Sequence, residues 1–343
     1  MSGRGLVLIT GLNGFIAGRT TEALLQAGHS VRGTVRSKAS AQATVEALAQ
    51  YGDRLEVIEV PDIAVAGAFD KAVEGVGGII HLAQPVTFNF PDPGAVLELV
   101  RGATRGILES ASKVSTIKSV VLLSSIVAVV SQKEGPYIFT EEDWNEGAIE
   151  AAAHLGEKAP GLLIYQASKT AGERAFWKFR DEKKPSFAMA AVNPVLVSGP
   201  PLTAPESADK IPGSLKYIWS IMSGGALSGP SGVVNFAWFV DVRDVAKLVA
   251  YIVDHADEAD GQRYISSTAW GPSQAAADIL RPAYPDLPIQ EGRPGEGYLP
   301  GFKTPGERDI DGSKALRAVG QEFVPYDKSV LDTAEVFKTL LQK

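Results

Sequence analysis

The sequence predicts an α/β protein with a doubly wound parallel sheet and a smaller, loop-rich second lobe. Three observations predict this fold class: short apolar runs alternate with helical stretches, a glycine-rich turn follows the first run, and proline and glycine accumulate after residue 194. The chain has 343 residues, of which 45% are hydrophobic, so it can bury a large core.

Runs rich in valine, isoleucine and leucine are expected to form the strands of this sheet. Several of them are apolar nearly throughout, which is typical of strands that helices cover on both faces. We therefore expect parallel strands that helices connect. The runs are residues 6–10, 30–35, 55–60, 78–83, 119–124 and 187–192.

The chain changes character after residue 194, where glycine and proline interrupt a segment with little periodicity. A helical stretch at 242–255 and a strand at 263–267 indicate that the chain then returns to the sheet. A last helix is expected at 329–341. We predict that residues 1–194 plus about 236–266 form the domain that contains the sheet, and that about 195–235 plus 267–343 form the second lobe.

The composition excludes several classes of function. A net charge of -7 leaves no positive field for polyanions, so neither nucleic acid nor an anionic membrane is an expected partner. The absence of cysteine excludes disulfides and thiolate chemistry, and the four histidines lack metal-ligand spacing, so no metal is expected. The apolar run at 6–9 is too short for a signal peptide or a membrane span, so we expect a cytoplasmic protein that acts on small molecules.

A glycine-rich turn at residues 10–18 joins the first strand to a helical stretch at 20–26. Gly11 permits the tight turn, Gly14 lets the backbone approach a pyrophosphate, and Ala17 allows close packing of the helix. The N-terminus of that helix attracts the same anion. A turn that only reverses the chain would also need glycine, but the context favours a Rossmann-type dinucleotide site. Its candidate contacts are Gly11, Asn13, Gly14, Phe15 and Ile16.

The end of the second strand distinguishes between the two nicotinamide dinucleotides. An acidic residue there would bind the ribose 2′-hydroxyl of NAD, whereas this chain has Arg36 and Lys38. Both cations can pair with a 2′-phosphate, and Arg36 can also stack on adenine. The sequence therefore predicts NADPH as the cofactor. The alternative is that Arg32, Arg36 and Lys38 form a solvated surface turn.

Tyr165 and Lys169 begin another helical pattern and lie one turn apart on one face of it. A phenol has a pKa of about 10 and is a poor acid near neutrality, but a nearby ammonium stabilises the phenolate. We therefore expect Lys169 to lower the pKa of Tyr165 and so to prepare it for acid–base catalysis. Lys169 could also hold the ribose of the cofactor.

Two serines end the apolar run at 119–124, at the carboxyl edge of the predicted sheet where ligands bind in open α/β folds. Either Ser124 or Ser125 could donate a hydrogen bond to the carbonyl oxygen of a substrate. Physical reasoning does not rank the two, and a serine in this position often only caps backbone groups.

Taken in order, these motifs resemble the extended short-chain dehydrogenases/reductases. They are most similar to the dihydroflavonol-4-reductase-like branch, nearest to the yeast and fungal NADPH-dependent methylglyoxal and carbonyl reductases. The likeness covers nearly the whole chain and includes residues 81–83, 142–145, 191–194 and 239–246. The resemblance implies NADPH-dependent reduction of an aldehyde or ketone, in which Ser125 binds the carbonyl oxygen and Tyr165 donates the proton.

The resemblance also implies contacts along the whole cofactor. It places Arg36 at the 2′-phosphate, Asp62 and Ile63 at the adenine, Ala83 and Gln84 along the cleft, and Pro194 and Val197 against the nicotinamide.

Two departures from the branch narrow the substrate. Flavonoid reductases carry an asparagine shortly after the serine, but residues 126–130 are wholly apolar here. Residues 161–164 also lack the Asn-Trp pair that is typical of cinnamoyl-CoA reductases. An apolar ketone, a ketoester or an α-dicarbonyl is therefore expected. The candidate pocket residues, each of which could equally belong to the core, are Phe88, Ile126, Val130, Leu162 and Leu196.

Two alternative functions remain open at this point. An NAD-dependent nucleotide-sugar epimerase or dehydratase of the extended family would use the same Ser-Tyr-Lys set, but Arg36 speaks against NAD. A non-catalytic NADP(H) redox sensor would use the same fold, but such sensors often lack the tyrosine that this chain has at Tyr165. The sequence is compatible with a monomer or a homodimer.

Overall fold

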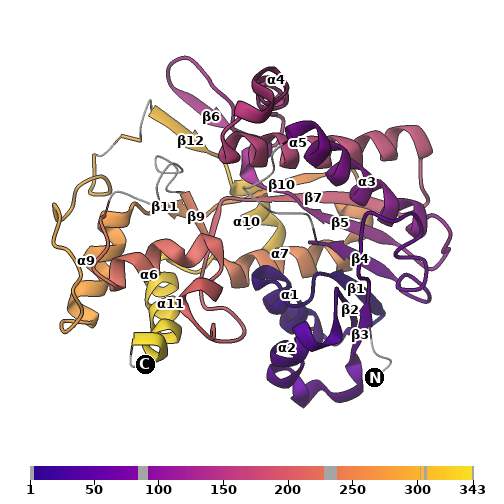
Figure 1. Ribbon diagram of the computed structural model, residues 1–343, viewed down its shortest axis with the longest axis horizontal. Coiled ribbons are helices and arrows are strands. Elements are labelled where there is room, and N and C mark those ends of the chain that lie inside the picture. The colour runs from indigo at the N-terminus through magenta and orange to yellow at the C-terminus, as the bar shows by residue number, and fades with distance from the viewer. Residues whose placement is uncertain (1–3, 84–91, 228–237, 302, 305–306, 342–343) are drawn as a thin grey trace.

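A seven-stranded parallel sheet forms the centre of the protein (Figure 1). Its strands are β1 (Leu6–Thr10), β2 (Ser30–Val35), β3 (Leu55–Glu59), β4 (Gly78–His81), β5 (Ser119–Leu123), β7 (Ala188–Pro194) and β10 (Arg263–Ser266). They lie in the order β10-β7-β5-β4-β1-β2-β3, and all neighbouring strands are parallel. The order reverses between β1 and β4, which is the property of a doubly wound, Rossmann-type sheet. The predicted fold class is confirmed.

The computed structural model describes the whole chain except residues 1–3, 84–91, 228–237, 302, 305–306 and 342–343. Among the helices it describes, none is long and apolar enough to cross a membrane. In the same part of the chain, no group of three or more His, Cys, Asp or Glu side chains is arranged to hold a metal ion.

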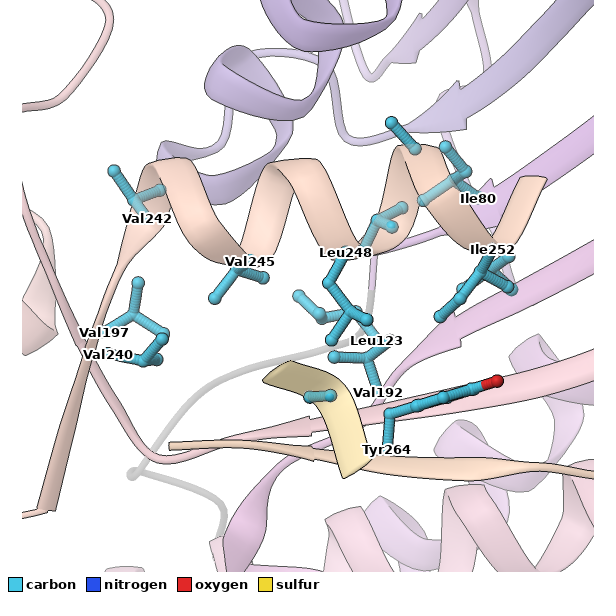
Figure 2. Packing of buried hydrophobic residues seen from close by; sticks show 14 of the residues in the cluster. Ile80, Leu123, Val192, Val197, Val240, Val242, Val245, Leu248, Ile252 and Tyr264 are labelled. Carbon is cyan, nitrogen blue, oxygen red and sulfur yellow. The ribbon is translucent and has the colours of Figure 1, made fainter. Parts of the chain in front are cut away.

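Helices cover both faces of the sheet. On one face lie α1 (Phe15–Gln26) and α7 (Val242–Asp254), and on the other lie α3 (Pro93–Ala111) and α5 (Gly161–Lys183). Successive residues of a strand point to opposite faces, so Ile9 packs in the first core and Leu8 in the second. Figure 2 shows the first core, where Leu248 of α7 points toward Leu123 and Val192 of the sheet.

The strands predicted at 6–10 and 30–35 have the expected bounds, and the ends of the others differ by one or two residues. The run at 78–83 is shorter than expected, because β4 already ends at His81. The backbone N–H groups of Leu82 and Ala83 donate to the Thr10 hydroxyl, at 3.0 and 2.9 Å, instead of continuing the ladder. This side-chain contact turns the chain away from the sheet and toward the glycine-rich turn.

A second group of elements lies beside the sheet. The helices α6 (Lys216–Met222), α9 (Ser273–Ala283) and α11 (Tyr326–Leu341) share a separate apolar core and group at the left of Figure 1. A small sheet in the order β11-β9-β8 adjoins them, formed by β8 (Leu196–Ser198), β9 (Trp238–Asp241) and β11 (Ala269–Trp270). The strand β9 pairs in this small sheet and leads directly into α7. The division of the chain into two lobes stays a prediction.

The remaining elements are short or peripheral. The strands β6 (Tyr137–Phe139) and β12 (Arg308–Ile310) form a two-stranded parallel sheet. The other helices are α2 (Gln42–Ala47), α4 (Glu146–Leu155), α8 (Ala256–Ala259) and α10 (Ser313–Val319).

Candidate active site

A cleft of about 520 Å³ opens where β1, β4, β5 and β7 end at their carboxyl edge. This is the position at which open α/β sheets bind ligands, next to the reversal of strand order. The cleft unites the predicted glycine turn, the predicted serine and the predicted Tyr-Lys pair. The predicted residues that line it are Gly11, Asn13, Gly14, Phe15, Ile16, Ala17, Ala83, Ser124, Ser125, Ile126, Tyr165, Lys169, Pro194, Leu196 and Val197.

Other predicted site residues lie elsewhere. Asp62 is exposed after β3, and its side chain accepts a hydrogen bond from the Ala64 backbone, while Ile63 packs against the core. Val130 packs against the other core, and Leu162 is partly buried in the first turn of α5 without lining the cleft. The predicted contacts Gln84 and Phe88 lie outside the described residues.

The sequence analysis missed one wall of the cleft. Pro212, Gly213 and Ser214, at a short turn before α6, line it. The sequence offers only a Pro-Gly loop signal there, and nothing local connects that loop to strands more than a hundred residues earlier. Leu82, Val127 and Val195 also line the cleft and were not predicted.

The glycine turn fits the pyrophosphate of a dinucleotide. Gly11 has a φ of +74°, a conformation that L side chains rarely adopt. Gly14 precedes α1 in an extended conformation, with no side-chain cap and no acidic residue in the first helical turn. The first N–H groups of α1 therefore have no side-chain partner from the cap position, and they face the cleft. A helix N-terminus of this kind favours an anion.

The end of β2 carries the two predicted cations, and both are exposed beyond the cleft. The backbone N–H of Lys38 donates to the Glu59 carboxylate at 2.6 Å. Glu59 is the last residue of β3, and the pairing of β3 with β2 brings this acid to the end of β2. The prediction of the cofactor considered only the residues at the end of β2 and did not include it. The hydrogen bond from the Lys38 backbone holds the Glu59 carboxylate against the turn, and the side chains of Arg36 and Lys38 are exposed to solvent.

Ser125 and Tyr165 meet in the middle of the cleft. Their side chains are hydrogen-bonded to each other, although they come from the end of β5 and from α5. The ammonium of Lys169, one turn further along α5, lies 6.0 Å from the centre of the Tyr165 ring. The three side chains thus line the same, largely apolar cleft.

The pKa of Tyr165 departs from the expected direction. Burial raises the pKa of Tyr165, and the hydrogen bond from Ser125 opposes that rise only in part. Neither cause of this net rise involves Lys169, so the lowering of the Tyr165 pKa by Lys169 stays a prediction. Burial acts on the lysine as well, and it lowers the pKa of Lys169 to about 8, against the opposing charge of Glu173.

The structure separates the two serines that the sequence could not rank. Ser124 donates its hydroxyl to Glu173 at 2.5 Å, on the buried side of the strand end. Ser125 caps the following turn, where its oxygen lies 3.4 Å from the Val127 nitrogen, and its side chain contacts Tyr165. The two hydroxyls have different partners because neighbouring residues in an extended segment point in opposite directions.

The fold and the cleft together define a class of protein: a Rossmann-type nucleotide-binding chain with a Ser-Tyr-Lys set at the carboxyl edge of its sheet. The chain belongs to the NAD dependent epimerase/dehydratase family, whose model matches residues 7–265.

Relatives in this family include named reductases. The NADPH-dependent methylglyoxal reductase GRE2 of Saccharomyces cerevisiae is 32% identical over 346 residues, covering 96% of each chain. The ketoreductase azaE of Aspergillus niger is 31% identical over 324 residues, which covers 92% of this chain and 93% of its own. Among solved structures, yeast methylglyoxal/isovaleraldehyde reductase Gre2 in complex with NADPH superimposes with a TM-score of 0.83 at 28% identity, over 98% of this chain and 100% of that one.

Proposed function

We propose that this protein is an NADPH-dependent carbonyl reductase that converts an aldehyde or ketone to the alcohol. It is an oxidoreductase, and its cofactor is NADPH, the dinucleotide that its yeast relative is named for and binds in the solved complex. The observation that carries the proposal is the hydrogen-bonded pair of Ser125 and Tyr165 beside Lys169, in the same cleft as the glycine turn.

NADPH, when bound, supplies the hydride that reduces the carbonyl carbon. Ser125 then donates a hydrogen bond to the carbonyl oxygen, and Tyr165 transfers its hydroxyl proton to that oxygen as the alcohol forms. The raised pKa of Tyr165 keeps the phenol protonated at neutral pH, which suits a proton donor. Lys169 contributes a positive charge next to the phenolate that proton transfer leaves behind.

The cleft supports an apolar substrate. Beyond the polar group, its walls come from apolar side chains, among them Leu82, Ile126 and Leu196. An apolar ketone, a ketoester or an α-dicarbonyl would bury its carbon skeleton there and keep its oxygen near Ser125 and Tyr165. A polyphenol or a CoA thioester would find few polar partners on these walls.

A panel of carbonyl compounds tests the function. Purified protein is mixed with NADPH or NADH and with aldehydes, α-diketones, β-ketoesters and aryl ketones, and the loss of reduced-cofactor absorbance is followed. We expect turnover of apolar carbonyls with a preference for NADPH. Protein that purifies with tightly held NAD and turns over none of them would favour the epimerase alternative. Tight NADPH binding without any turnover would favour the redox sensor.

Arg36→Ala tests the choice of cofactor. The lost partner of the 2′-phosphate is a charged hydrogen bond, which stabilises by about 1.5–3 kcal/mol, so the ratio of the NADH to the NADPH Kd should fall by roughly 10–100-fold. Fluorescence titration of both cofactors measures this ratio. The control is Arg105→Ala, which removes another exposed arginine, from α3, where it pairs with Glu109. An unchanged ratio in Arg36→Ala would show that Arg36 belongs to a solvated turn.

A further inference from the structure

Glu173 is a buried carboxylate to which the proposed reaction assigns no role. It lies on α5, one turn after Lys169 and two turns after Tyr165, and its side chain is fully buried. A buried acid needs partners that compensate for the loss of water. The identity of those partners indicates what this acid does.

The carboxylate of Glu173 accepts hydrogen bonds from four side chains on different parts of the fold. One oxygen accepts from the Ser124 hydroxyl at 2.5 Å and from the Asn193 amide at 2.7 Å. The other accepts from the Arg263 guanidinium at 2.6 Å and from the Trp177 indole at 3.3 Å. Glu173 therefore ties α5 to the strands β5, β7 and β10 of the sheet.

One of these partners leads directly to the reacting group. The Asn193 amide that binds Glu173 also donates to the backbone oxygen of Ser125, at 3.2 Å. Ser124, the second partner, is the neighbour of Ser125 in the chain. The carboxylate thus holds the segment that carries Ser125 at a defined distance from the helix that carries Tyr165.

Glu173 also acts on the charge of Lys169. Residues four apart on a helix are neighbours, and the carboxylate opposes the loss of the lysine proton that burial favours. From β4, His81 faces the same lysine, and its own pKa is lowered to about 4 by burial and by Lys169, so it contributes no charge at neutral pH. Tyr165 is the third titratable group beside this lysine.

The positive partner of Glu173 is fixed on its other side. Arg263 donates to the backbone oxygens of Glu141 and Asp143, and its guanidinium lies 3.8 Å from the ring centre of Trp144. These contacts hold the guanidinium in one place, so the carboxylate stays oriented between Arg263 and the chain segment of Ser125.

We propose that Glu173 is a positioning residue for the reaction: it fixes Ser125 against Tyr165 through Asn193, and it keeps Lys169 in its charged form. A residue that served the fold alone would hold the same four donors. Such a residue would not change the pH at which Lys169 loses its proton.

Two substitutions of Glu173 separate these possibilities. Glu173→Gln keeps the shape and removes the charge, and Glu173→Asp keeps the charge and shortens the side chain. The readout is the pH dependence of kcat/KM for NADPH, which reports ionisations of the free enzyme. In the wild type, we expect an alkaline limb near pH 8, where Lys169 loses its proton.

The charge decides the expected result. Without the carboxylate, Lys169 loses its proton more easily, so the alkaline limb of Glu173→Gln should move to lower pH by about one unit. Glu173→Asp should lose activity at every pH while its limb stays near the wild-type position. A Glu173→Gln profile that is lower by the same factor at every pH, with an unmoved limb, would overturn the proposal.

Glu173→Gln leaves the buried Arg263 without its carboxylate, which often destabilises a fold. Glu173→Gln combined with Arg263→Met removes both charges and serves as the second variant, with the same expected downward shift. Failure of both variants to fold would show that Glu173 serves stability first and would count against the proposal.

This role rests on the proposed function, so the Kd of NADPH is also measured against pH. The Kd requires no carbonyl substrate. As the pH rises, the affinity for NADPH should begin to fall at a lower pH in Glu173→Gln than in the wild type. If the wild type reduces no carbonyl but the two proteins differ in this way, the reductase proposal is disproved and the link between Glu173 and Lys169 is kept. If the wild type is a reductase but the two proteins do not differ, the reductase proposal is kept and the link is disproved.

Discussion

Tyr165→Phe is expected to lower kcat by about 10²–10⁴-fold, the usual contribution of a general acid. The phenol is the proton donor that the cleft places next to Ser125. Phenylalanine keeps the ring and removes the hydroxyl, so the cofactor site should stay intact. Steady-state reduction of the best carbonyl from the panel measures kcat, and fluorescence titration measures the Kd of NADPH, which should change little.

Tyr251→Phe is the matched control. Tyr251 is a partly exposed tyrosine on α7, and its hydroxyl contacts Glu258 rather than the cleft. The Tyr251→Phe variant should keep the wild-type kcat. Retention of most of the activity in Tyr165→Phe would contradict the assignment of the proton donor, whatever the effect on substrate affinity.

Ser125→Ala is expected to lower kcat by about 10²–10³-fold, as the loss of one donor to a developing oxyanion does. In the structure this hydroxyl is the polar group that accompanies Tyr165, and alanine at this position leaves the carbonyl oxygen with one donor. Because the interaction strengthens as charge develops on that oxygen, kcat should fall more than KM rises.

Ser124→Ala separates the two adjacent serines. The Ser124 hydroxyl points to Glu173, so its removal costs one of the four hydrogen bonds to that carboxylate and leaves the contact of Ser125 with Tyr165. A loss of about tenfold or less is expected, in keeping with about 1.5 kcal/mol for a hydrogen bond to a charged group. Equal losses in the two variants would disprove the distinction between them.

Much of the fold could be predicted from the sequence, because the signals are local. Apolar runs of the right length predicted all the strands of the large sheet, and the glycine turn was placed between β1 and α1. Helix starts were less certain: α1 begins at Phe15 and α5 at Gly161, several residues before the periodic patterns become visible. The small helix α6 and the pairing of β9 in the small sheet were not predicted.

The features of the candidate site that could be predicted from the sequence are also local ones. The spacing of Tyr165 and Lys169 determined that both lie on one face of a helix, because that relation depends only on the helical repeat. The sequence likewise determined the strand-turn-helix geometry that fits a pyrophosphate, because glycine at these positions acts on the adjacent backbone.

Only the tertiary structure decided which serine faces Tyr165, which donors surround Glu173, and that Pro212 to Ser214 line the cleft. It also decided the direction of the Tyr165 pKa, which burial raises although a cation lies nearby. The physical reason is common to all of these. Burial and hydrogen-bond partners arise from side chains that are far apart in the sequence, and they exist only once the strands and helices have packed together.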